Sequence, residues 1–187
     1  MDIKLFRLAF LLMASQLLAI CASGQIYMTK TGQTSFFSET PLENISAVNQ
    51  HVAVLLNSAN GEIAVRMQHR AFSFPNKLMQ EHYNENYMET EKYPAASFTG
   101  KISEPIDYGR DGTYPVSAEG VLDIHGVKQK RVLKGQLVVD HGQCTLDCEF
   151  GVRLSDHNIQ VPTLVLAKIA ESISVKNKFV LTGKKNP

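Results

Sequence analysis

The sequence predicts a mainly all-β protein built of about eight antiparallel strands, with one or two short helices. Apolar and polar residues alternate over most of the chain, turn-forming pairs such as Asn60-Gly61 separate several of the alternating stretches, and helical spacing is confined to short segments. Alternation gives each strand one apolar face, which a β-sandwich and a β-barrel both require. The pattern therefore leaves these two architectures open.

The composition is that of an ordinary globular protein. Of the 187 residues, 44% are hydrophobic and 20% are charged. Lys and Arg number 19 against 18 Asp and Glu, and no basic run is interleaved with aromatic residues. A nucleic-acid partner is therefore not expected. Because no internal repeat or linker is evident, the chain beyond its N-terminal segment is interpreted as one domain.

The first 24 residues have the pattern of a secretory signal peptide. Lys4 and Arg7 precede an apolar run over residues 8–20, and small residues follow at 21–24. The apolar run is shorter than the roughly 20 residues of a transmembrane helix, so a permanent membrane span is not expected. The segment predicts an exported protein whose mature domain covers residues 25–187.

Cys21 leaves lipidation open as an alternative to simple cleavage. Lipoprotein processing prefers a small residue before the cysteine, and Ile20 is bulky. Cleavage after Gly24 is the preferred interpretation.

The alternating stretches are interpreted as strands, and two pairs of them have a recognisable turn. Asn60-Gly61 predicts a hairpin between the second and third stretches, and Asp140-His141-Gly142 predicts another between the sixth and seventh. In chain order, the predicted strands cover residues 32–38, 51–57, 62–70, 95–102, 114–124, 131–140, 143–154 and 171–182.

The two cysteines of the mature chain are expected to be free. Cys144 and Cys148 lie four residues apart on the apolar face of one predicted strand. At about 3.3 Å per residue they are roughly 13 Å apart, well beyond the reach of a disulfide. No second Cys or His pair accompanies them, so a metal site is not expected either.

Three segments are predicted to be helical. Thr40-Pro41-Leu42-Glu43 has the form of a capping box, which predicts a helix to about Val48. Residues 75–88 place apolar side chains at helical spacing, and residues 163–169 are expected to form a short helical turn.

The sequence predicts no catalytic residues, no metal ligands and no cofactor. The 6 histidines are scattered without an H-x-x-x-H pair, and no glycine-rich phosphate loop is present. His125 is expected to bond a backbone carbonyl from a turn. The pair Asp156-His157 leaves a hydrolase as an alternative, although no serine lies in a G-x-S-x-G setting.

The predicted inward face leaves two interpretations of equal weight. Side chains could fill a dry core, or small residues among bulky ones could leave an elongated apolar cavity able to hold a lipid chain. The small inward residues are Ala96, Gly100, Ala118, Gly120, Gly135, Cys144 and Cys148.

Several motifs resemble those of the YceI-like family. Residues 118–127 (A-E-G-V-L-D-I-H-G-V) are similar to the family's A-x-G-x-L-x-I-H-G-V signature, and residues 92–98 match its K-Y-P-x-A-x-F link. Residues 150–156 resemble its late strand and acidic turn, and residues 36–45 resemble a form common among Bacteroidetes members. The resemblance extends from about Tyr27 to Leu181.

The resemblance implies a lipocalin-like, extended, eight-stranded antiparallel β-barrel. Such a barrel would hold a long isoprenoid or other lipid, with a quinone as one form of ligand, in a protein exported to the periplasm. It implies no catalysis. One departure lies at Thr31–Phe36, where many members have an aspartate and a His-Ser pair.

The leading hypothesis is a non-enzymatic lipid carrier with an apolar ligand and, at most, a transient membrane or protein partner. Ala118→Phe or Gly135→Phe should block lipid uptake and leave the fold intact. The alternative is a filled barrel that serves as a protein-interaction or stress-related module. The predicted cavity wall consists of Met67, Phe98, Tyr114, Val116, Ala118, Leu122, Leu133, Leu146, Phe150, Val152, Ile173, Val175 and Phe179.

Overall fold

Eight long antiparallel strands close into a barrel. The computed structural model describes residues 24–161 and 169–184. The strands are β1 (Ile26–Glu39), β2 (Asn44–Asn57), β3 (Glu62–Gln68), β5 (Ala95–Ile102), β6 (Gly112–Ile124), β7 (Val127–Asp140), β8 (Gln143–Arg153) and β9 (Ser172–Lys184).

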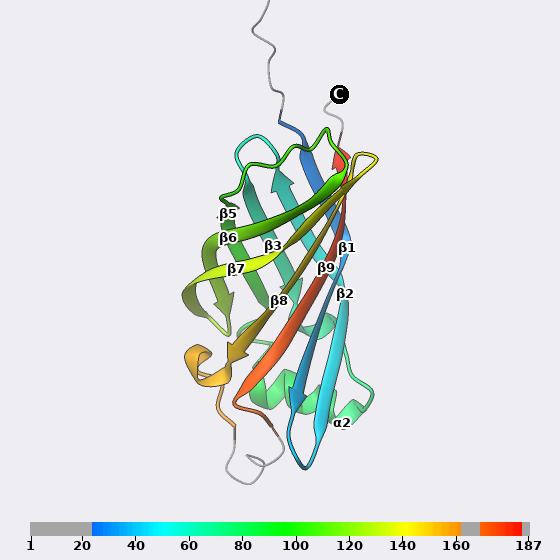
Figure 1. The fold of residues 1–187 in the computed structure, drawn as a ribbon. Helices are drawn as coiled ribbons and strands as arrows, with labels where there is room; N and C mark the ends of the chain where they lie inside the picture. Colours follow the sequence, from blue (N-terminus) through cyan, green and yellow to red (C-terminus); the bar gives the residue numbers. More distant parts are fainter. Residues whose placement is uncertain (1–23, 162–168, 185–187) are drawn as a thin grey trace, which may run out of the picture.

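The strand order explains how the barrel closes. Neighbouring strands follow the order β1-β9-β8-β7-β6-β5-β3-β2, and β1 also pairs with β2, so no long edge strand remains (Figure 1). The two-residue strand β4 (Phe72–Ser73) pairs with β2. A lipocalin-like closed barrel with eight long strands is the predicted fold class, and it is confirmed.

One end of the barrel is filled. Tyr27, Leu56, Leu137 and Leu181 converge there from four strands, and each is at most 2% exposed. Tyr108, in the connection between β5 and β6, stacks on the Tyr27 ring with a centroid distance of 5.2 Å. Side chains and this connection therefore close the end at which the described chain begins and ends (Figure 1).

A helical segment lies at the other end of the barrel (Figure 1). It comprises α2 (Lys77–His82) and a π-helical turn η3 (Tyr83–Tyr87). The Asn76 side chain caps α2 by accepting a hydrogen bond from the Leu78 N–H. The helix predicted over residues 75–88 is present, and it begins at the residue after its Asn76 cap.

The helix predicted from Thr40 to Val48 is wrong. Residues 40–43 form the turn between β1 and β2, and residues 44–48 belong to β2. The Thr40 hydroxyl does bond the backbone N–H and carbonyl of Glu43, as a capping residue would. A four-residue turn makes the same local contacts, and pairing of β2 with β1 then decides in favour of the hairpin.

All eight predicted strands are present at the predicted positions, and most of them are longer in the structure than predicted. Residues 95–102 form a strand with the predicted bounds, whereas residues 69 and 70 of the predicted third strand belong to the 3-10 turn η2 (His69–Ala71). Gly61 and Gly142 have φ values of 75° and 78°, as tight hairpin turns require.

Two predictions fall mainly outside the described residues. These are the signal peptide over 1–24, of which only residue 24 is described, and the helical turn over 163–169, of which only residue 169 is described. Within the described part of the chain, no helix has the length and apolar character needed to cross a membrane.

Candidate functional site: an apolar cavity in the barrel

A cavity of about 400 Å³ occupies the barrel between the filled end and the helical segment. Inward side chains of all eight long strands line it, together with side chains of α2 and η3. Phe150, Ile173 and Val175 are only half-buried although they belong to this wall, because open space lies beside them. The interior of this part of the barrel is therefore not filled by side chains.

The structure brings together every predicted wall residue except Tyr114. Alternation explains this agreement, because residues two apart on each strand face the same side. On β6, for example, Val116, Ala118 and Leu122 all line the cavity, whereas Glu119 and Val121 between them are exposed.

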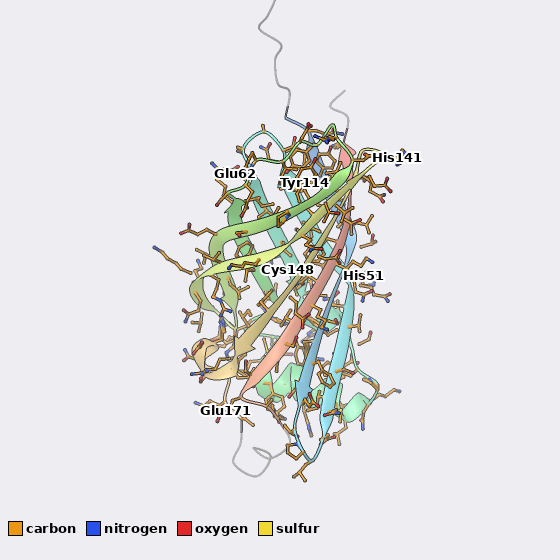
Figure 2. All side chains as sticks on the ribbon, viewed as in Figure 1. His51, Glu62, Tyr114, His141, Cys148 and Glu171 are labelled. Carbon is orange, nitrogen blue, oxygen red and sulfur yellow. The ribbon has the colours of Figure 1, made fainter. Side chains whose placement is uncertain are left out.

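Tyr114 was wrongly placed on the cavity wall. It lies toward the filled end, whereas Cys148 lies about midway along the barrel (Figure 2). The Tyr114 hydroxyl is 2.9 Å from the Arg110 carbonyl oxygen and 3.1 Å from that of Asp107. Tyr114 follows the same alternation as Val116, but at its level the barrel interior is already filled, so its side chain secures the connection between β5 and β6.

Two of the small inward residues do not create open space. A Cβ atom at Gly100 or at Gly120 would lie 2.8 Å from Cζ of Phe98. The Phe98 ring therefore lies over both glycines, and their lack of a side chain makes room for it. Gly135 does line the cavity, but a Cβ atom there would lie 2.3 Å from the Asp147 carbonyl oxygen. The expectation that Gly135→Phe would leave the fold intact is therefore wrong.

An aromatic group at the helical end was not predicted as part of the wall. Phe36, Phe72 and Phe74 surround Tyr83, with ring centroids 5.7, 5.7 and 5.0 Å from that of Tyr83. All four residues line the cavity. The alternation of Phe72 and Phe74 is the sequence signal that would have found two of them.

Thr34 and Asn177 form a polar pair on the wall. The Thr34 hydroxyl donates to Oδ1 of Asn177 at 2.7 Å, and the two residues are 1% and 9% exposed. They belong to β1 and β9 and are register partners in that ladder. The pair was not predicted, because its members lie 143 residues apart in the chain.

A histidine cluster adjoins the helical end of the cavity. His69 Nδ1 lies 2.9 Å from the Tyr83 hydroxyl oxygen, and burial together with the nearby His125 lowers the pKa of His69 to about 4. His125 is within hydrogen-bonding distance of the His157 carbonyl oxygen and of Glu89, at 3.1 and 3.0 Å. The prediction that His125 bonds a backbone carbonyl from a turn is confirmed.

Asp156 and His157 do not form a catalytic pair in the described structure. The His157 ring is completely buried, and neither of its nitrogens has a hydrogen-bond partner among the described residues. Asp156 is exposed, and its backbone carbonyl accepts a hydrogen bond from Gln129. A hydrolase would need the carboxylate and the ring to meet in a substrate cleft.

Cys144 and Cys148 are free thiols, as predicted. Cys148 lines the cavity, whereas Cys144 belongs to the packed core. Burial raises the pKa of both thiols to about 11, so neither is a reactive thiolate near neutral pH.

These features define a lipocalin-like closed barrel with an apolar interior cavity. The sequence matches the YceI-like domain over residues 26–181, and the chain therefore belongs to the YceI-like family. A comparison with curated protein sequences gives no match.

Solved structures share the fold at low sequence identity. A polyisoprenoid-binding domain from Saccharophagus degradans, implicated in plant cell wall breakdown, has a TM-score of 0.72 at 14% identity, with 85% of this chain and 98% of that domain covered. Burkholderia cenocepacia BcnA has a TM-score of 0.66 at 15% identity, with 81% and 96% covered. The Campylobacter jejuni YceI protein has a TM-score of 0.56 at 18% identity, with 72% and 81% covered.

Proposed function

We propose that this protein binds a long apolar chain of isoprenoid type inside its barrel and carries it in an exported compartment. The observation that carries the proposal is the cavity of about 400 Å³, whose wall is mainly aliphatic and aromatic. Binding sites for small apolar molecules have this size and character. The polyisoprenoid-binding domain with the same fold supports the choice of an isoprenoid.

The driving force for binding is burial of apolar surface. At about 25 cal/mol per Å², a chain that buries several hundred Å² gains on the order of 10 kcal/mol before entropy losses are subtracted. Micromolar affinity requires roughly 8 kcal/mol, so burial alone is of sufficient size.

Three observations favour a binding protein over an enzyme or a filled-barrel interaction module. Asp156 and His157 are not assembled into an acid/base pair, and the family and its structural neighbours suggest binding. The open cavity argues against a barrel filled by its own side chains. The proposed ligand is thus the functional partner, and no cofactor is invoked.

Export to the periplasm belongs to the same proposal. It is supported by the signal-peptide pattern of residues 1–24. The N-terminal sequence of the protein recovered from periplasmic extract tests it. A mature chain that begins at Gln25 supports export, and an intact Met1 in the cytoplasmic fraction contradicts it.

A graded series at Ala118 tests the binding site. Ala118 lines the cavity from β6, so Ala118→Leu and Ala118→Phe should lower prenyl-lipid binding in that order, with the Phe variant losing at least about tenfold, because each reduces the volume left for a ligand. The matched control is Val132→Phe, on the exposed side of β7 at a residue that is 58% exposed. Equal affinity in all variants, with circular dichroism unchanged, would contradict the proposed site.

A further inference from the structure

The described wall of the cavity contains no lysine and no arginine. Strand alternation explains this on β9, where Asn177 faces the cavity while its neighbours Lys176 and Lys178 are exposed on the outer surface. Nζ of Lys176 lies 3.4 Å from a Glu149 carboxylate oxygen. A phosphate or diphosphate inside the barrel would thus meet no permanent cation on the described wall, and burial of an unpaired anion is strongly unfavourable.

Histidine does not replace the missing cations. The only histidines on the described wall are His69 and His82. The pKa of His69 is lowered to about 4, so its ring is neutral near pH 7. His82 is exposed on α2, at the rim of the cavity rather than within it. Glu43, in the β1–β2 turn, is the one carboxylate on the described wall.

The amide of Asn177 retains hydrogen-bonding capacity toward the cavity. Its Oδ1 accepts from the Thr34 hydroxyl, and its Nδ2 lies 3.5 Å from the Cys148 carbonyl oxygen, which fixes the orientation of the amide. This one long contact involves a single N–H, and no second acceptor for Nδ2 is present among the described residues. The Thr34 oxygen also keeps free lone pairs, so the pair can donate to and accept from one polar group.

The pair lies deep in the cavity. In the β8–β9 ladder, Asn177 faces Cys148, one layer from Leu146 and Phe179, which lie toward the filled end. In the other direction, Phe150 and Val175 form the next layer on the way to α2. An inward layer corresponds to two residues, or about 6.6 Å along a strand. A ligand whose polar group reached Asn177 would therefore have entered with that group first.

We propose that Thr34 and Asn177 bind the neutral head group of the ligand, which is a prenyl chain ending in a carbonyl or hydroxyl oxygen and not a prenyl phosphate or diphosphate. This inference rests on the proposed function and adds the class of head group and the orientation of the ligand. A carbonyl head accepts a hydrogen bond from Asn177 Nδ2, and a hydroxyl head can in addition donate to Thr34 Oγ1. The chain then extends past Phe150 and Val175 toward α2.

The test compares probes that share one prenyl chain and differ only at the end: a quinone, an alcohol, a hydrocarbon and a diphosphate. Affinities for the full mature protein are measured by equilibrium competition against the radiolabelled alcohol. The quinone and alcohol should bind about fivefold more tightly than the hydrocarbon, as one or two neutral hydrogen bonds provide. The diphosphate should bind at least about 100-fold more weakly than the alcohol, because its charge cannot be neutralised at this site.

Two variants test whether the differences in affinity between these probes depend on Thr34 and Asn177. Thr34→Val keeps the side-chain shape, and Asn177→Leu removes the amide. Asn177→Leu should abolish the roughly fivefold advantage of both the alcohol and the quinone, because it removes the donor to the head group. Thr34→Val should weaken binding of the alcohol more than that of the quinone, because a quinone has no proton to donate to Thr34 Oγ1. Neither variant should change hydrocarbon affinity. Lys178→Gln, on the outer face next to Asn177, is the control and should change none of the affinities.

The outcomes separate this inference from the proposed function. Equal binding of diphosphate and alcohol would overturn the inference, as would a uniform loss for all probes in Thr34→Val and Asn177→Leu, which would give the pair a purely structural role. If Asn177→Leu fails to fold in thermal unfolding, Thr34→Val decides alone. Failure of every probe to bind the wild-type protein would instead refute the proposed function itself.

Discussion

His69 is a buried histidine whose environment favours the neutral ring. It is 3% exposed, its Nδ1 faces the Tyr83 hydroxyl, and its Nε2 has no partner among the described residues. Burial keeps both rings neutral, so the proton of their hydrogen bond lies on the Tyr83 oxygen or on Nδ1 according to the tautomer of the His69 ring. Protonation of the ring would place a charge without a partner among these buried groups.

The stability of the protein should therefore fall in acid. The pKa of His69 is about 4 in the folded state against 6.5 in the unfolded chain, so between these values only the unfolded chain binds the proton. The contribution of the neutral His69 ring to the free energy of unfolding is fully present above about pH 6.5 and is lost as the pH falls toward 4. The total loss is about 3 kcal/mol of unfolding free energy.

Urea unfolding from pH 7 to pH 4 measures this effect, with His69→Gln as the comparison. The variant is expected to be less stable at pH 7 and to lose less stability on acidification. Parallel curves for wild type and variant would show that another group is responsible.

Tyr114 makes a separate prediction, because its hydroxyl serves the connection between β5 and β6 rather than the cavity. Tyr114→Phe should lower the unfolding free energy by about 1 kcal/mol or less, since the hydroxyl is partly accessible to water, and leave prenyl-lipid affinity unchanged. Urea denaturation and lipid binding measure the two effects. A loss of prenyl-lipid affinity at unchanged stability would show that Tyr114 belongs to the binding site.

At the level of single elements, β8 contains an internal probe of cavity occupancy. Cys148 lines the cavity and Cys144 is in the packed core, and both thiols have a pKa of about 11. Both should react slowly with maleimide at pH 8 in the native protein. A bound prenyl lipid should slow labelling of Cys148 further by covering it.

Peptide mass mapping of the labelled sites measures the two rates independently. Cys144 is the built-in control, because its protection comes from core packing and should not depend on lipid. Unchanged labelling of Cys148 at saturating lipid would place the ligand elsewhere on the protein.

The turn between β1 and β2 shows why one element was mispredicted. The contacts of Thr40 with Glu43 are local, and both a helix cap and a tight turn can make them. The choice depends on pairing of residues 44–57 with β1, which is a long-range interaction. The helix at 77–87 was predicted correctly because its apolar face has its own periodicity.

At the scale of the whole molecule, the sequence predicts the wall of the barrel better than its contents. Alternation assigns Val116, Ala118 and Leu122 to one face whatever their neighbours are. Whether that face encloses space depends on side chains from different strands, as when the Phe98 ring covers Gly100 and Gly120. For the same reason, the meeting of Thr34 with Asn177 has no local signal in the sequence.

The central claim is that the barrel holds a prenyl chain, and native mass spectrometry of the mature protein tests it most directly. The protein is isolated without detergent from its exported compartment, and its mass is compared before and after extraction with organic solvent. The account predicts an additional mass that is lost on extraction and that corresponds to a prenyl lipid with a neutral head. An unliganded mass that persists after incubation with prenyl alcohols and quinones would contradict it.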